Sequence, residues 1–213
     1  VIDGIFKVAE LMYGLKFNEI NDVPKYHKEV RVFEVYENNG DFLSLLYIDL
    51  HPRETKNGGA WMTEFRSQGL YEGEIQRPLV AIVCNLTPST EERPSLLTFN
   101  EVETIFHEFG HALHGMLSNV TYSSLASPDV YWDFVELPSQ IMENWLGEKE
   151  TLNLFAHHYE TGEIIPNELI EKIKASRSFN AGMFGLRQIS LGLLDMAWHT
   201  GEPKNIDNVE KFE

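Results

Sequence analysis

The sequence predicts a mainly α-helical fold with a small β-sheet in its N-terminal third. Between residues 30 and 84, apolar residues form short runs separated by turn-forming residues, a pattern typical of strands. After Pro94 the apolar residues follow the helical spacing i, i+3, i+4 and i+7. We therefore expect one partial domain over residues 1–213, with a helix and a small sheet in 1–95 and a helical subregion in 96–213.

The N-terminal elements follow from apolar spacing and from the positions of turn-forming residues. Asn38-Asn39-Gly40 lies between two β-rich runs, which is typical of a hairpin turn. Scattered glycines and charges indicate a loop before the last strand. In chain order we expect a helix over 1–16, a turn-rich break over 18–24, paired strands over 30–36 and 42–50, a loop over 52–78 and a strand over 79–84.

The clearest helix of the chain has a marked beginning. Thr98 with Glu101, or Asn100 with Glu103, matches the pattern in which two side chains satisfy free amides at a helix start. Pro138 predicts that the next helix begins late or bends. Further helices are expected over 134–146, 151–161, 167–174 and 184–199.

Composition excludes several classes of protein. The net charge of −16 has no basic stripe within it, so we expect no nucleic-acid partner. No apolar run is long enough to span a bilayer. Cys84 is the only cysteine, which excludes an internal disulfide and fits a reducing, cytoplasmic location. The chain begins at Val1 without Met and stops in an acidic stretch, so we expect both ends to be cuts.

Residues 107–111 carry the pattern His-Glu-x-x-His within the predicted capped helix. Helical geometry puts His107 and His111 one turn apart on one face, so both imidazoles can bind one metal ion. Zn²⁺ accepts nitrogen and carboxylate ligands and, in catalytic sites, keeps one position for water. Glu108 is placed to act as the general base. The alternative is a buried helix with incidental histidines, because the pattern also arises by chance.

A third ligand is needed, and spacing alone leaves it open. A metzincin would have glycine at position 114 and histidine at 117, where this chain has His114 and Leu117. That class is therefore excluded. The acidic candidates downstream are Asp129, Asp133, Glu136 and Glu143.

Two segments resemble the signatures of the thimet oligopeptidase and peptidyl-dipeptidase family of gluzincins. They are Phe-His-Glu-Phe-Gly-His-Ala-Leu-His at 106–114 and Asp-Phe-Val-Glu-Leu-Pro-Ser-Gln at 133–140. Gly-Gly-Ala-Trp-Met at 58–62 and Val-Cys-Asn at 83–85 also look like family segments, so the resemblance covers nearly the whole chain.

The resemblance implies the ligand set and the fold. His107, His111 and Glu136 would bind zinc, and Glu108 would be the general base. The chain would form a zincin-like catalytic core, part of a larger helical metallopeptidase, with 96–213 as its zinc-binding subregion. The family's oxyanion-stabilising His and Tyr and its large N-terminal helical part have no counterpart in this chain. Between Ser124 and Tyr131 the sequence also departs from the family, whose members often have a Gly-containing turn there, so the family's substrate contacts in this loop are not carried over.

The implied function is zinc-dependent hydrolysis of short peptides. Within the family, the resemblance favours the bacterial peptidyl-dipeptidases. The alternatives are an endo-acting oligopeptidase of the same family and a non-catalytic zinc-binding fragment. A zinc aminopeptidase ranks last, because its acidic ligand would lie nearer the histidines, where only Asp129 is available. The oligomeric state is not predicted.

Four further expectations concern residues around the motif. We expect His114 at the helix surface or behind the ligands, and Asp133 as a helix cap. Gln140 either orients a ligand histidine or is an ordinary helix amide. We expect the tryptophans in the core or in an interior wall: Trp61, Trp132, Trp145 and Trp198.

Overall fold

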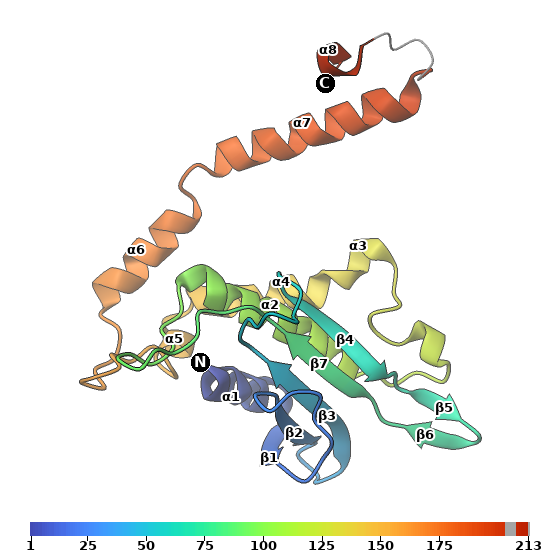
Figure 1. The fold of residues 1–213 in the computed structure, drawn as a ribbon, viewed down its shortest axis with the longest axis vertical. Coiled ribbons are helices and arrows are strands. Elements are labelled where there is room, and N and C mark those ends of the chain that lie inside the picture. Colours follow the sequence, from blue (N-terminus) through green and yellow to red (C-terminus); the bar gives the residue numbers. More distant parts are fainter. Residues whose placement is uncertain (203–207, 213) are drawn as a thin grey trace. The chain divides into compact units, whose positions relative to one another are not determined.

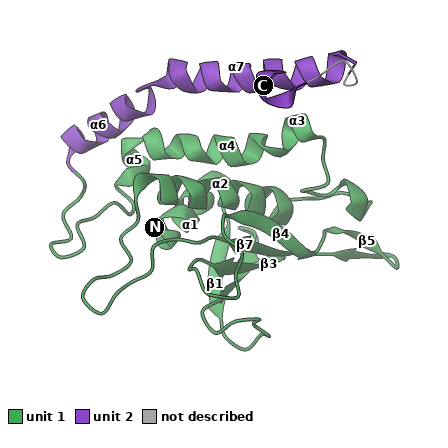
Figure 2. Cartoon of the chain, turned by 45° about the horizontal axis from the view of Figure 1, so that its top comes forward, with its two compact units in different colours: residues 1–165 green, residues 166–213 purple. Residues whose placement is uncertain are grey.

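A computed structural model of the chain describes residues 1–202 and 208–212. The chain divides into two compact units, residues 1–165 and residues 166–213 (Figure 2). In the described residues, no helix combines the length and the apolarity that crossing a membrane requires. Unit 2 contains helices α6 (Asn167–Arg177), α7 (Ala181–Thr200) and α8 (Val209–Phe212).

Unit 1 contains one larger sheet and the helices packed beside it (Figure 1). Its elements are α1 (Ile2–Tyr13), β1 (Lys16–Ile20), β2 (Arg31–Tyr36), β3 (Phe42–Asp49), β4 (Trp61–Arg66), β5 (Gly69–Tyr71), β6 (Glu74–Gln76), β7 (Leu79–Val83), α2 (Phe99–Met116), α3 (Trp132–Val135), α4 (Leu137–Asn144) and α5 (Lys149–Leu152).

The five-stranded sheet has the order β1-β2-β3-β7-β4, and β5 pairs with β6 in a separate hairpin. Neighbouring strands are antiparallel except β3 and β7, which run parallel with Leu46 opposite Val80. The expected hairpin of β2 and β3 is confirmed, as is the strand at β7. A helical protein with a small sheet in its N-terminal part is therefore the observed fold class.

The sequence prediction missed both edges of this sheet. Strand β1 begins at the last residue of the predicted helix over 1–16 and runs into the predicted break over 18–24, and the predicted loop over 52–78 contains β4, β5 and β6. An edge strand has one free side, where polar and charged residues lie in solvent. The exposed Lys16 and Arg66 are such residues, and charged or polar residues also interrupt the apolar runs of both strands.

The predicted helix over 151–161 is also wrong. Helix α5 ends at Leu152, and the following residues form turns with an isolated bridge between His157 and Ile164. The amide of Gly162 donates to the carbonyl of His158, and Gly162 has a φ of 73°, which closes this loop. By contrast, the expected helices at α6 and α7 are confirmed.

Helix α2 lies against the sheet and carries the predicted motif. Its apolar side is buried, with Phe106 and Phe109 at most 1% exposed. At its C-terminal end the Arg77 guanidinium donates to the carbonyls of Met116 (2.7 Å) and Ser118 (3.2 Å). The last carbonyls of a helix have no hydrogen-bond donors within the helix, and Arg77 supplies donors for them. The same bonds connect the end of α2 to the segment before β7.

The start of α2 is the capping box predicted from Thr98 and Glu101. The Glu101 amide donates to Thr98 Oγ1, and the Thr98 amide donates to Glu101 Oε2 at 2.8 Å. The Thr87 amide adds a bond to Glu101 Oε1 at 2.6 Å. These backbone donors, from Thr98 first, lower the pKa of Glu101 from 4.5 to about 2.

Glu101→Gln is therefore expected to lower the free energy of unfolding by about 1 kcal/mol or less at neutral pH, because the site is open to solvent. The pKa is depressed on folding, so the stabilisation is present above pH 4.5 and is lost as the pH falls towards about 2. Urea unfolding of parent and variant across this range measures the effect. An equal difference at all pH values, or the same loss in the exposed Glu91→Gln control, would contradict the expectation.

Candidate metal centre

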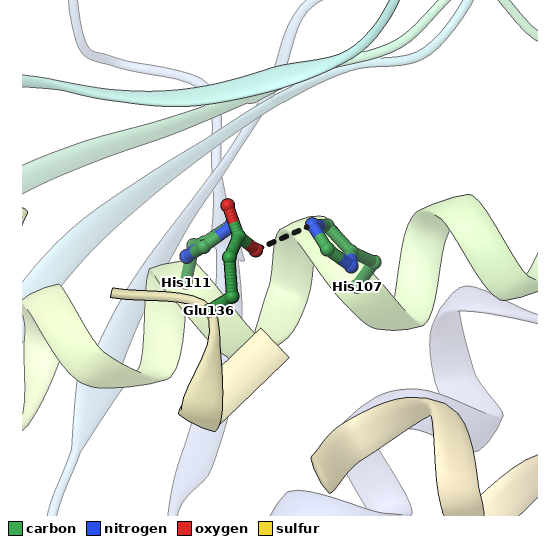
Figure 3. A group of neighbouring side chains, drawn as sticks. All are labelled: His107, His111 and Glu136. Carbon is green, nitrogen blue, oxygen red and sulfur yellow. Dashed lines mark ion pairs between the residues drawn. The ribbon is translucent and has the colours of Figure 1, made fainter. Parts of the chain in front are cut away.

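The structure brings His107, His111 and Glu136 together (Figure 3). Both histidines lie on α2, and Glu136 lies at the junction between α3 and α4. Glu136 Oε2 is 3.2 Å from His107 Nε2 and 3.1 Å from His111 Nε2. Among the described residues, these three form the group of acidic, His or Cys side chains that could hold a metal ion.

The spacing of these atoms fits a tetrahedral ion. Zinc bonds of about 2.0–2.2 Å at tetrahedral angles put neighbouring ligand atoms about 3.3 Å apart. The two measured distances to Glu136 Oε2, 3.2 and 3.1 Å, are close to that value. Nitrogen and carboxylate donors are also the types that zinc accepts.

The pKa shifts of Glu136 and His111 favour the protonation states that bind metals. Ser139 Oγ donates to Glu136 Oε2 at 2.7 Å, and this bond is the main cause that lowers the pKa of Glu136. Burial lowers the pKa of His111, which favours its neutral form, although the carboxylate of Glu136 opposes this. A metal requires an ionised carboxylate and a neutral imidazole, so both shifts favour binding.

Gly110 allows α4 to approach α2 closely enough to bring Glu136 to the histidines. A Cβ atom at this position would lie 2.5 Å from Pro138 O and 2.5 Å from Ser139 Cα. Both are backbone atoms of α4, which cannot rotate away as a flexible side chain could. The helix contact therefore depends on a residue without a side chain.

Gly110→Ala is expected to lower the free energy of unfolding by about 2 kcal/mol or more, because backbone must move to admit the methyl group. The shift of α4 should also weaken zinc binding through Glu136. Urea unfolding and chelator competition measure the two effects. Gly182→Ala in α7 is the matched control, because its Cβ would meet nothing within 4 Å. Equal effects of the two substitutions would contradict the steric explanation.

Glu143 lies behind His107. Its Oε1 is 2.6 Å from His107 Nδ1. A carboxylate can only accept, so Nδ1 carries the proton and the lone pair of Nε2 faces Glu136. From the sequence, Glu143 was one of four candidate ligands, and Gln140 was expected either to orient a ligand histidine or to be an ordinary helix amide. Glu143 in fact contacts the histidine, and its place two helical turns after Glu136 could have indicated a shared face.

Glu143→Gln is expected to lower zinc affinity by about 10- to 100-fold, because an amide holds the ring orientation less firmly than a carboxylate. Competition with a chromophoric chelator gives the dissociation constant. The exposed Glu150→Gln is the control for the change in net charge. Unchanged affinity in Glu143→Gln would remove Glu143 from the support of the site.

Glu108, the predicted general base, is 6% exposed. Burial raises its pKa, and the carboxylate of Glu136 raises it further. The charge of His107, and to a smaller extent the nearby backbone of Met62, oppose this rise in the pKa of Glu108. Glu108 therefore lies beside the metal-ligand group in an environment that favours accepting a proton.

The other residues singled out from the sequence lie apart from the ligand group. His114 packs its ring edge-on to Phe134 with centroids 5.8 Å apart, and burial lowers its pKa. Asp133 occupies the first turn of α3, whose N-cap is Tyr131, so the expected cap is wrong. Trp132 is 93% exposed, which contradicts its expected place in a core.

Comparison with known protein families finds a match that covers nearly the whole chain. A sequence model described as peptidase family M3 matches residues 1–212. This match includes the segments that carry the ligand group, the buried Glu108 and the edge strand β4.

Several characterised proteins are similar to this chain. It is 42% identical to oligopeptidase A of Escherichia coli strain K12 over 93% of its length and 29% of the relative. It is 39% identical to the dipeptidyl carboxypeptidase of the same strain (99% and 31%) and 38% identical to the thimet-like oligopeptidase of Dictyostelium discoideum (98% and 32%). The chain thus spans about a third of the length of each of these relatives. From the match over residues 1–212, the chain belongs to peptidase family M3.

Proposed function

We propose that this protein hydrolyses peptide bonds in short oligopeptides with zinc as its cofactor. The observation that carries the proposal is a donor set of two histidines and one carboxylate beside a buried glutamate. His107, His111 and Glu136 would hold the ion, and Glu108 would be the general base.

Each residue has a defined task in this proposal. Zinc, when bound, supplies Lewis-acid polarisation and a lowered pKa of water. Glu108 takes the proton from the attacking water and delivers it to the leaving amine. Glu143 accepts from His107 and fixes the direction of its Nε2, while Ser139 donates to Glu136 and fixes the third ligand.

The comparisons support peptides as the substrate class, because the matching relatives are named as oligopeptidases and dipeptidyl carboxypeptidases. The resemblance of the motifs predicted release of C-terminal dipeptides. A second candidate, cleavage within the peptide, is favoured by the 42% identity to oligopeptidase A. The cytoplasmic location inferred from Cys84 stays a prediction.

Product mapping tests the proposal and separates the two modes of cleavage. The full-length zinc-loaded protein is incubated with an unstructured peptide, and the products are identified by mass spectrometry at early times. Successive dipeptides from the C-terminus would identify a peptidyl-dipeptidase, and internal cuts that tolerate a C-terminal amide would identify an oligopeptidase. Intact peptide in the presence of stoichiometric zinc would overturn the proposal and favour a non-catalytic zinc module.

A further inference from the structure

We propose that Trp132 is a specificity-determining residue, whose ring binds a basic side chain of the peptide substrate, an arginine or a lysine. The ring lies next to the metal-ligand group, in a part of the chain that carries negative charge. This inference rests on the proposed function, because it names the kind of peptide that the same site prefers. It goes beyond that function in giving a task to a residue that neither binds the metal nor moves a proton.

The position of Trp132 follows from the short helix that also carries the third candidate ligand. Trp132 is the first residue of α3, and Glu136 is the C-cap of the same helix. The Val135 amide donates to the carbonyl of Tyr131 at 3.1 Å, so the backbone makes a full helical turn here. Side chains four residues apart lie on one face of a helix, with Cβ atoms about 5–6 Å apart. Trp132 therefore projects from the side of α3 that carries Glu136, whose carboxylate contacts both histidines (Figure 3).

The ring of Trp132 contributes almost nothing to the packing of unit 1. Trp132 is 93% exposed, and the preceding Tyr131 is 88% exposed. Phe134 in the same helix differs, because its ring packs against His114. Neighbouring large aromatic side chains that are left in solvent are typical of binding surfaces. The face of a tryptophan ring is also the aromatic surface that attracts cations most strongly.

The charge of this part of the chain indicates which kind of side chain the ring would receive. Residues 94–148 contain both helices of the metal-ligand group, and they include no Lys or Arg. The same range has eight acidic residues: Glu101, Glu103, Glu108, Asp129, Asp133, Glu136, Glu143 and Glu148. Even with a divalent ion bound, the segment keeps a negative net charge. A surface of one charge sign concentrates ligands of the opposite sign, so a cation is favoured here.

The ring and the acidic residues act on the same group of the peptide. Asp129 and Asp133 flank Trp132 in the sequence, and both are exposed. Salt screens such charges, so by themselves they attract a basic peptide only weakly. A guanidinium or ammonium group within about 6 Å of the ring centroid gains a short-range attraction in addition. The ring therefore fixes where the basic side chain binds, and the acidic residues exclude a negatively charged one.

A pair of matched peptides tests the preference for a cation. Each unstructured peptide carries either arginine or citrulline at one position, and this position is moved along the peptide through the series. Citrulline keeps the shape of arginine but has no charge. In the full-length zinc-loaded protein, kcat/KM for arginine is expected to exceed that for citrulline by about 10-fold at the position that meets Trp132. Added salt should lower this ratio, because it screens the acidic residues.

The variant Trp132→Leu tests the residue itself. Leucine keeps an apolar side chain but has no aromatic face, so the ratio of arginine to citrulline is expected to fall to about 2-fold. Trp132→Phe should keep part of the ratio, because phenylalanine retains a ring. Tyr71→Leu is the control, since it removes an exposed aromatic ring from the β5–β6 hairpin and should leave the ratio unchanged. A purely structural role of Trp132 would lower kcat/KM equally for both peptides.

Each outcome has a distinct meaning. Equal kcat/KM for arginine and citrulline at every position of the parent's substrate would overturn the preference for a cation. A ratio in Trp132→Leu equal to that of the parent would overturn the role of Trp132. If the parent cleaves neither peptide, the proposed function fails. Binding of fluorescently labelled arginine and citrulline peptides to the zinc-loaded parent and to Trp132→Leu, followed by anisotropy, then decides the inference, and equal dissociation constants would overturn it.

Discussion

Glu108→Gln is expected to lower peptide hydrolysis by at least about 100-fold while leaving zinc bound, because general acid–base catalysis contributes about 10²- to 10⁴-fold. Glutamine has nearly the same shape as glutamate but cannot accept a proton at neutral pH. The measurement is kcat/KM of the full-length variant, normalised to zinc determined by elemental analysis.

The zinc content of Glu108→Gln distinguishes loss of the general base from loss of the metal site. A variant that loses activity together with zinc has lost the site rather than the base. Full zinc content with activity within a few-fold of the parent would show that Glu108 is not the proton acceptor. The half-buried Glu103→Gln on the same helix would serve for comparison only if its own zinc content equals that of the parent, because Glu103 has contacts of its own.

The second large effect concerns the metal. Zinc at about 100 times its dissociation constant is expected to raise the free energy of unfolding by about 2.7 kcal/mol, because it binds the folded chain and not the unfolded one. In His111→Ala and Glu136→Ala this gain should disappear, since each removes one of the converging donors. Urea unfolding with and without zinc, together with elemental analysis, measures it.

Magnesium is the control in this experiment, because it prefers oxygen ligands in octahedral geometry and should leave the unfolding curve unchanged. A gain with zinc that persists in both variants would mean that the ion binds elsewhere. No zinc in the folded parent would overturn the ligand assignment and leave a peptidase-like fold without its cofactor. Cobalt or copper binding alone would not decide the question, since affinity follows ligand type only loosely.

The fold was predictable where a segment's own residues determine its structure. The apolar period of α2 and the pairing of Thr98 with Glu101 predict a helix with a defined start, and both are observed. The edge strands β1 and β4 were missed because charged and polar residues interrupt their short apolar runs. The helix predicted beyond Leu152 is wrong for a different reason. The apolar residues there have helical spacing, but the backbone forms turns rather than continuous helical hydrogen bonds.

The candidate site was predictable only within a single helix. The spacing of His107 and His111 follows from helical geometry, but four downstream acids were open as the third ligand, and the family resemblance selected Glu136. The distance that joins Glu136 to the histidines depends on the close approach of α4 at Gly110, which no local pattern encodes. The contact of Glu143 with His107 also depends on the packing of α4 against α2, although its spacing of two helical turns from Glu136 could have indicated a shared face. The ligand and base roles themselves stay predictions until metal and activity are measured.

The parallel pairing of β3 with β7 bears on how this chain is made in the cell. A nascent chain that has reached Val83 already carries all five strands of the larger sheet, because every one of them precedes α2. Glu136 emerges about 50 residues later, which at about 5–20 residues per second takes a few seconds of translation. During that interval the nascent chain carries all five strands, and then the histidine pair, without the carboxylate of Glu136. The complete donor set therefore exists only after every strand of the larger sheet has been synthesised.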